Sequence, residues 1–257
     1  MNPLLAKERL STHWAVPPWV RCEHLARYRF CTSYVVGKRV VDCACGEGIG
    51  SELFAVSGAT AVEAFDSSGE TITAARARHA QPNLRFQVAD ALRLPLPNQW
   101  ADLYVALETI EHLEDDAQFL EEARRVLKPD GIFICSTPNR AVTNPGTTLA
   151  QRPWNRFHTR EYTEEEFFDR LGRAFEQIER YGQNRQSPKT LRAISGTAAI
   201  VPPRWVVWMI QLRKAPRWLF DRDEYHAVEP LVQGQVDEYL LAVCRGPRVG
   251  SDPGGGV

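Results

Sequence analysis

The chain has no apolar run long enough to cross a membrane, no marked excess of either charge, and no cysteine pattern typical of disulfides. With a formal net charge of -1 over 257 residues, it lacks the strongly basic face that a nucleic-acid backbone attracts. Its most apolar later stretch, residues 205–212, is far shorter than the about 20 residues of a membrane-spanning helix. The N-terminal residues lack the apolar run of a signal peptide, so we expect a cytoplasmic protein.

The six cysteines do not form a recognisable ligand or disulfide set. Cys43, Cys45, Cys135 and Cys244 lie in or beside runs that are predicted to be buried strands, where free cysteine behaves as a small apolar residue. Cys43 and Cys45 are one residue apart, and no second pair has the spacing of zinc ligands. We therefore predict no metal site and a reducing compartment.

A glycine loop is the most informative feature that is present. In VVDCACGEGIG (40–50), an apolar run ends in Asp42, and glycines follow at 46, 48 and 50. A buried strand that turns through glycines into a helix lets a ligand lie against bare backbone, because no Cβ holds it away.

The spacing of this loop excludes two common phosphate-binding motifs. The dinucleotide fingerprint places its third glycine three residues after the second, whereas here Gly50 follows Gly48 by two. A P-loop needs lysine and then serine or threonine after its glycines, and no lysine occurs between residues 38 and 128. The loop carries Asp42 and Glu47 instead, which favours a ligand with positive charge.

Two further acids follow predicted strands. Asp66 ends the second predicted strand, where a carboxylate can accept hydrogen bonds from both ribose hydroxyls. Asp90 follows the third predicted strand and could accept a hydrogen bond from an exocyclic amine such as that of adenine. Helix capping or turn formation is the alternative for both acids and for Asp42.

In order along the chain, these features resemble the class I S-adenosylmethionine-dependent methyltransferases. The resemblance covers roughly residues 22–185, and such an ordered set is more specific than the glycine loop alone. EHL and STPNR, after the fourth and fifth predicted strands, resemble the small-molecule branch, which includes ubiquinone-pathway O-methyltransferases and sugar and natural-product methyltransferases. The matching segments are VVDCACGEGIG (40–50), AFD (64–66), VADALRLPLP (88–97), ADLYVALETIEHL (101–113), EEARRVLKPDGIFICSTPNR (121–140) and FHTREYTEEEF (157–167).

Alternating strands and helices predict an α/β fold, a Rossmann-like and mostly parallel sheet with helices on both faces. The resemblance implies seven strands with the final strand antiparallel. Pro129-Asp130-Gly131 predicts a turn into the fifth strand. The predicted strands are 39–43, 61–65, 84–88, 102–107, 131–136, 174–182 and 238–245, and the predicted helices are 49–56, 70–80, 115–127 and 163–173.

The predicted core, residues 37–183, is completed by the final strand in 237–247. Residues 1–36, with a helix around 24–30, are interpreted as an N-terminal helical lid. The insertion 184–236 is interpreted as a second lid, with a dimer contact or ordinary surface helices as the alternative. We expect the glycine-rich tail 248–257 to be disordered.

The resemblance implies S-adenosylmethionine as cofactor, with S-adenosylhomocysteine as product. In this family the first acid orients the loop or meets the methionine amino group through water, and backbone groups of Ala44 and Gly46 make the direct contact. Tyr28, on the first helix, could bind the cofactor carboxylate. The predicted cofactor-binding residues are Tyr28, Asp42, Ala44, Gly46, Gly48, Asp66, Ser67, Asp90, Ala91 and Glu108.

His112 is the predicted catalytic base, because it follows the fourth strand near the expected methyl group and imidazole titrates close to neutral pH. Glu111 is predicted to orient it; the alternative is that both residues shape the start of the next helix. The predicted acceptor-binding residues are Asn139, Arg140, His158 and Tyr162. We treat His13, His79 and His226 as surface residues.

These features predict methyl transfer to an oxygen or nitrogen of a small molecule, namely a sugar, quinone or natural-product scaffold, by in-line displacement. The alternatives are a nicotinamide-dependent oxidoreductase, weakened by the glycine spacing, and a non-catalytic S-adenosylmethionine-binding protein. The expected partner is a small-molecule acceptor, with neither nucleic acid nor membrane, and a homodimer is left open.

Overall fold

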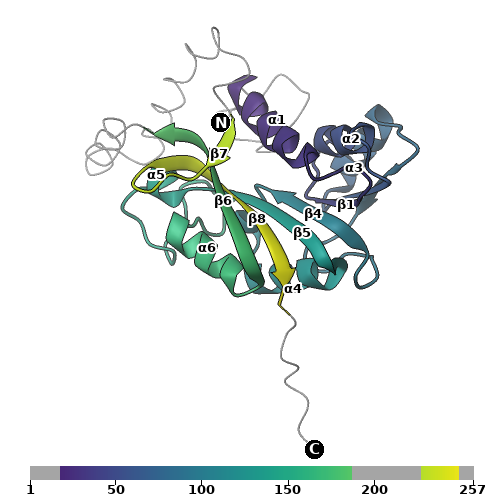
Figure 1. Ribbon diagram of the computed structural model, residues 1–257. Helices are drawn as coiled ribbons and strands as arrows, with labels where there is room; N and C mark the ends of the chain where they lie inside the picture. Colours follow the sequence, from purple (N-terminus) through teal and green to yellow (C-terminus); the bar gives the residue numbers. More distant parts are fainter. Residues whose placement is uncertain (1–17, 187–226, 249–257) are drawn as a thin grey trace, which may run out of the picture.

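The computed structural model describes residues 18–186 and 227–248, and these residues build an eight-stranded sheet (Figure 1). The strand order is β3-β2-β1-β4-β5-β8-β6-β7. The first five strands along the chain run parallel, and β8 lies antiparallel between β5 and β6. The strands are β1 (Arg39–Cys43), β2 (Ala61–Asp66), β3 (Leu84–Val88), β4 (Ala101–Leu107), β5 (Leu127–Pro138), β6 (Phe175–Gln186), β7 (Val228–Pro230) and β8 (Val236–Pro247).

Helices cover both faces of this sheet, because neighbouring residues of the buried strands point to opposite sides. Val40 of β1 packs in the apolar cluster with α1 and α2, whereas Val41 packs in the cluster with α4 and α6. Figure 1 shows these two helical layers. The helices are α1 (Pro18–Thr32), α2 (Ile49–Val56), α3 (Gly69–Arg78), η2 (Ile110–His112), α4 (Asp116–Val126), α5 (Arg140–Thr143) and α6 (Glu164–Gly172).

The predicted α/β fold with an antiparallel final strand is confirmed. Strands 39–43 and 84–88 and helix 49–56 have the predicted bounds. The four cysteines predicted to be buried are buried. Helix α6 begins at the predicted cap Thr163, whose side chain and Glu166 form a capping box.

Several features differ from the sequence prediction, among them the short helices η2 and α5, and two of them concern the sheet. The sheet has an eighth strand, β7, which pairs with the outer edge of β6 over three residues. The turn predicted at Pro129-Asp130-Gly131 is a bulge within β5, because the pairing with β4 shifts from Ala101↔Leu127 to Leu103↔Ile132.

Much of the two predicted lids, residues 1–36 and 184–236, lies outside the described residues, as does most of the tail. Helix α1 is the described part of the first segment, and it packs on α2 through Tyr28 and Phe54. In the described part of the chain, no helix combines the length and apolar character that crossing a bilayer requires.

Candidate functional site

The glycine loop follows the carboxyl end of β1 and leads into α2. Gly46 and Gly48 have φ angles of 57° and 84°, in the left-handed region that favours glycine. Gly48 is the N-cap of α2. Gly50 lies under Tyr28, where a Cβ would come within 1.9 Å of the aromatic ring. Gly46 and Gly48 are therefore favoured by their backbone conformation. Gly48 and Gly50 are required because a Cβ would have no space there.

Gly46 differs from its neighbours, because a Cβ built on it would have no protein atom within 4 Å. Gly46 itself is buried, but the space beside its Cα holds no protein atom and can take part of a ligand. Ala44, two residues earlier, is exposed and has a φ of 61°, which is unusual for a residue with a Cβ. Strained backbone of this kind is found most often where a ligand is held.

Asp42 is fully buried at the end of β1 and connects this strand to two helices. Its carboxylate accepts hydrogen bonds from the Ser51 hydroxyl at 2.5 Å and from the Tyr28 hydroxyl at 3.3 Å. Burial raises the pKa of Asp42 to about 7, although both hydrogen bonds oppose the shift. The Asp42 carboxylate thus links α1 to α2 beside the loop, and its orienting role stays a prediction, as does the cofactor contact of Tyr28.

Asp66, at the end of β2, lies beside the same loop. Its carboxylate accepts hydrogen bonds from the Gly46 amide at 3.2 Å and the Ser68 amide at 2.8 Å. These bonds fix the carboxylate next to the open position at Gly46. Ser67 is exposed at the adjacent position. The predicted ribose role of Asp66 is compatible with this place and stays a prediction.

Asp90 and Ala91 follow β3, the outermost strand on this side. Asp90 is exposed, and its carboxylate accepts a hydrogen bond from the Leu92 amide at 2.9 Å, which closes a local turn. Ala91 is half-buried. The carboxyl ends of β1, β2 and β3 thus bring the glycine loop, Asp66 and Asp90 to one edge of the sheet, which we call the cofactor end.

His79 was predicted to be a surface residue, and this prediction is wrong. Its ring contacts the backbone carbonyl of Glu47 at 3.1 Å and the carboxylate of Glu52 at 2.7 Å. Glu47 itself binds Arg78 at 2.5 Å. The charge of Glu47 is therefore paired within the protein, and His79 supports the glycine loop from α3. No local sequence pattern predicts either contact.

The ends of β4 and β5 form the other half of the site, which we call the acceptor end: Glu108, Glu111, His112 and His158. Glu108 follows β4 with a φ of 51° and accepts a hydrogen bond from the Ser136 hydroxyl at 2.6 Å. The guanidinium of Arg27 lies 3.9 Å from its carboxylate. Arg27 is fully buried, and the sequence analysis did not find it, because nothing local distinguishes it from other arginines.

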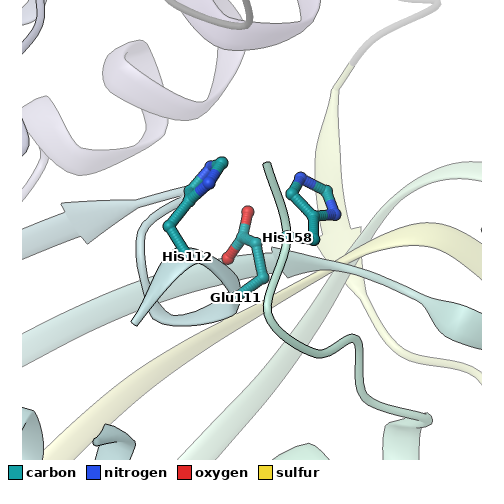
Figure 2. Close-up of side chains that lie close together, drawn as sticks. All are labelled: Glu111, His112 and His158. Carbon is teal, nitrogen blue, oxygen red and sulfur yellow. The ribbon is translucent and has the colours of Figure 1, made fainter. Parts of the chain in front are cut away.

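Glu111, His112 and His158 come together at this end, as Figure 2 shows. The carboxylate of Glu111 lies between the two imidazole rings, whose centroids are 4.8 Å apart. Glu111 is fully buried, and burial together with the nearby Glu108 raises its pKa well above the usual range. One of its oxygens accepts a hydrogen bond from Thr137 at 3.0 Å, and the other has no hydrogen-bond partner.

Each histidine is held through its Nδ1 atom. His112 Nδ1 lies 3.0 Å from the Phe157 carbonyl, and His158 Nδ1 lies 2.6 Å from the Glu161 carboxylate. Both partners are acceptors, so Nδ1 carries the proton in the neutral rings and Nε2 carries the lone pair. Glu161 was missed in the sequence, although its spacing of three residues from His158 is a usable signal.

The other predicted acceptor-binding residues make structural contacts. The Asn139 side chain caps α5 and binds the backbone of Asp237, and Nη2 of Arg140 donates to both carboxylate oxygens of Glu166 at 2.5 Å. Tyr162 is buried, and its hydroxyl donates to Asp116 at 2.7 Å. Each of these three side chains therefore has a structural role in the fold. Their predicted roles in binding the acceptor stay predictions.

A mostly parallel sheet with a glycine loop after its first strand and an antiparallel β8 beside β5 defines the class I methyltransferase fold. Comparison with known proteins agrees with this fold. The methyltransferase domain family matches residues 41–135, from β1 through most of β5. Residues 41–135 are thus similar to this methyltransferase domain family, and the chain resembles S-adenosylmethionine-dependent methyltransferases.

Relatives and solved structures agree with this assignment. A probable S-adenosylmethionine-dependent methyltransferase of Mycolicibacterium smegmatis is 37% identical over 63% of this chain and 60% of its own length. The ubiquinone/menaquinone biosynthesis C-methyltransferase UbiE of Caulobacter vibrioides is 39% identical over 42% of this chain and 47% of its own length. The chain thus spans about half to three fifths of these relatives.

Among solved structures, a SAM-dependent methyltransferase from Thermotoga maritima superposes with a TM-score of 0.59. The superposition covers 89% of this chain and 93% of the other, at 16% sequence identity. At this identity the likeness concerns the fold. The likeness in fold extends beyond residues 41–135, which the family matches.

S-adenosylmethionine is the cofactor of this family, and the cofactor end fits it. The open backbone at Gly46 accommodates a ligand that a Cβ would exclude. The buried carboxylate of Asp66 is positioned beside that opening. The residues that would hold the cofactor are therefore Ala44, Gly46 and Asp66, with Tyr28 and Asp42 fixing the loop.

Proposed function

We propose that the protein transfers a methyl group from S-adenosylmethionine to an oxygen or nitrogen of a small molecule. The acceptor class is a sugar, quinone or natural-product scaffold. The observation that carries this proposal is the arrangement at one edge of the sheet. An open glycine loop after β1 lies beside Asp66, and His112 follows the adjacent strand β4 with its ring orientation fixed.

The chemistry demanded of the protein is small. Bound S-adenosylmethionine supplies a methyl group that its sulfonium already activates. The protein has to hold the acceptor atom about 3–3.5 Å from that carbon and to take up a proton where the acceptor is an alcohol or phenol. The orientation of His112 supports it as the base. Its Nδ1 is engaged by the Phe157 carbonyl, so Nε2 is the atom that accepts the proton.

Methylation of a ring carbon is a second candidate, and the similarity to UbiE favours it. A base that deprotonates a phenol increases the electron density on the ring carbons next to the oxygen. His112 would then serve a carbon acceptor in the same way as an oxygen acceptor. Product analysis by NMR separates the outcomes, because methyl groups on oxygen, nitrogen and carbon differ in chemical shift.

Calorimetry tests the cofactor part of the proposal. We expect S-adenosylhomocysteine to bind in the micromolar range and NAD not to bind. Incubation of the protein with methyl-labelled S-adenosylmethionine and a panel of hydroxylated and amino compounds then tests transfer. Because folds are shared by proteins with different functions, transfer has to be measured rather than inferred from the fold. Binding of NAD, or binding of neither ligand, would overturn the proposal.

A further inference from the structure

We propose that Glu111, His112 and His158 form a binding site for one divalent transition-metal ion. One ligand atom from each residue lies within 4.8 Å of the others, and Figure 2 shows the Glu111 carboxylate between the two rings. Zinc bonds to imidazole and carboxylate are about 2.0–2.2 Å long, so shifts of about an ångström bring all three onto one ion.

The Glu111 carboxylate is the first reason to expect a cation. The side chain is fully buried, and one of its oxygens has no hydrogen-bond partner. A buried acceptor without a hydrogen-bond partner destabilises the fold, and more so where it carries charge. Glu108 adds a second carboxylate nearby. A cation between Glu111 and the rings would give this oxygen a partner.

The partners of the two histidines are the second reason. Histidine ligands of metals almost always donate their other N–H to a carboxylate or backbone carbonyl. His158 does so to Glu161, and His112 does so to the Phe157 carbonyl. Asn155 Nδ2 lies 3.0 Å from His158 Nε2, which agrees with a lone pair on that nitrogen. An ion would replace the Asn155 amide there.

Hydrogen bonds join the backbone segments that carry Glu111, His112 and His158. Thr159 donates from its amide and its hydroxyl to the Glu111 carbonyl, at 2.8 and 3.0 Å. Glu161 is fixed in turn by the Asn144 amide at 2.6 Å. These bonds join η2 to the loop that carries His158. The three side chains are thus set on a prearranged framework, as a metal site needs.

Two imidazole nitrogens and one carboxylate favour zinc, cobalt or iron over magnesium or calcium, which prefer all-oxygen sites. Three protein ligands also leave a position for water or an acceptor hydroxyl. A hydroxyl bound there would lose its proton more readily, which favours alcohol and phenol acceptors. This last consequence rests on the proposed function, whereas metal binding does not. His112 Nε2 can hold either the ion or a proton.

The test is titration of the untagged, chelator-treated full chain with cobalt(II), followed by visible absorption, and with zinc by calorimetry. We expect one ion per chain, and at least about tenfold weaker binding for Glu111→Gln and for His158→Gln. Glu161→Gln, which acts through His158 Nδ1, is expected to weaken binding as well. The matched control is His79→Gln, since His79 also pairs with a carboxylate but lies outside the cluster. It should bind the metal as the wild type does.

Binding that is absent in the wild type, or equal in wild type, Glu111→Gln and His158→Gln, would overturn the proposal. Should a buried variant fail to fold by circular dichroism, His112→Gln serves instead, because His112 is only half-buried. S-adenosylhomocysteine binding to the metal-free protein is measured in parallel. If it persists while no metal binds, only the metal site fails; if it is lost while metal still binds, only the proposed function fails.

Discussion

The cofactor end and the acceptor end lie at the same edge of the sheet but are built differently. At the cofactor end, backbone faces the ligand: Gly46 is open, and the Asp66 carboxylate is fixed by main-chain amides. At the acceptor end, side chains face one another, as with Glu111 between His112 and His158. The first end is thus suited to one invariant ligand, and the second can change chemistry through single substitutions.

The largest effect is expected at the acid that anchors the cofactor end. The pKa of Asp42 is raised to about 7 by burial, so the folded protein retains a proton that the unfolded chain loses above its ordinary pKa near 4. Asp42 therefore makes the free energy of unfolding fall as pH rises from about 4 to about 7, by up to about 1.4 kcal/mol per pH unit. We expect Asp42→Asn to remove this decline, measured by denaturant unfolding across that range.

Asp102 provides the control for this experiment. It lies near the start of β4, and Lys128 and the Arg39 amide lower its pKa despite some desolvation. Its contribution to stability is therefore lost as pH falls, not as pH rises. Asp102→Asn should leave the decline between pH 4 and 7 in place. An unchanged slope in Asp42→Asn would show that Asp42 is ionised in the folded protein.

The next largest effect is expected from a substitution at the acceptor end, which should change turnover without changing cofactor affinity. His112→Ala should lower turnover of a hydroxyl acceptor by about 10²-fold or more, because the proposed base, or the proposed metal ligand, is lost. Affinity for S-adenosylhomocysteine should stay the same, since the cofactor end is untouched. The rate is measured as product formation at saturating cofactor. Turnover close to that of the wild type would leave His112 a positioning role at most.

The difference between the two ends also explains how far sequence analysis reached. The cofactor end depends on one contiguous segment, residues 40–50, and on acids that directly follow apolar runs. Such local patterns fix strand ends, so β1, α2 and β3 were predicted with their observed bounds. The three-residue strand β7 was missed because pairing with β6, rather than its own sequence, defines it.

The acceptor end depends on contacts between distant segments. The sequence analysis singled out Glu111 and His112 as a pair. His158 lies beside them because the loop after β5 folds back, which no local pattern predicts. The absence of a metal site was predicted from cysteine spacing, which says nothing about a cluster assembled by folding. Arg27 pairs with Gln183 of β6, a contact that no local pattern predicts.

A smaller effect is expected from the carboxylate beside the glycine loop. Asp66→Ala should weaken S-adenosylhomocysteine binding by about 1–3 kcal/mol, because a charged acceptor for the ribose hydroxyls is lost together with its bond to the Gly46 amide. Calorimetry measures the change. Asp102→Ala, at the opposite end of the sheet, should bind normally. Equal affinity of Asp66→Ala and the wild type would remove Asp66 from the site.

The smallest expected effect on stability comes from replacing single glycines. A comparison of Gly46 with Gly37 distinguishes the effect of backbone strain from the loss of space for a ligand. Gly46 and Gly37 both have left-handed φ angles, 57° and 72°, and at both a Cβ would meet no protein atom within 4 Å. Alanine at either position should therefore lower the free energy of unfolding by a similar amount, about 1 kcal/mol. Gly37, however, precedes β1, at the other end of the strand. Only Gly46→Ala should also weaken S-adenosylhomocysteine binding, because only there would the methyl group occupy the space proposed for the cofactor. If both variants bind equally well, the cofactor does not lie against Gly46, and the cofactor end is not the backbone cradle described above.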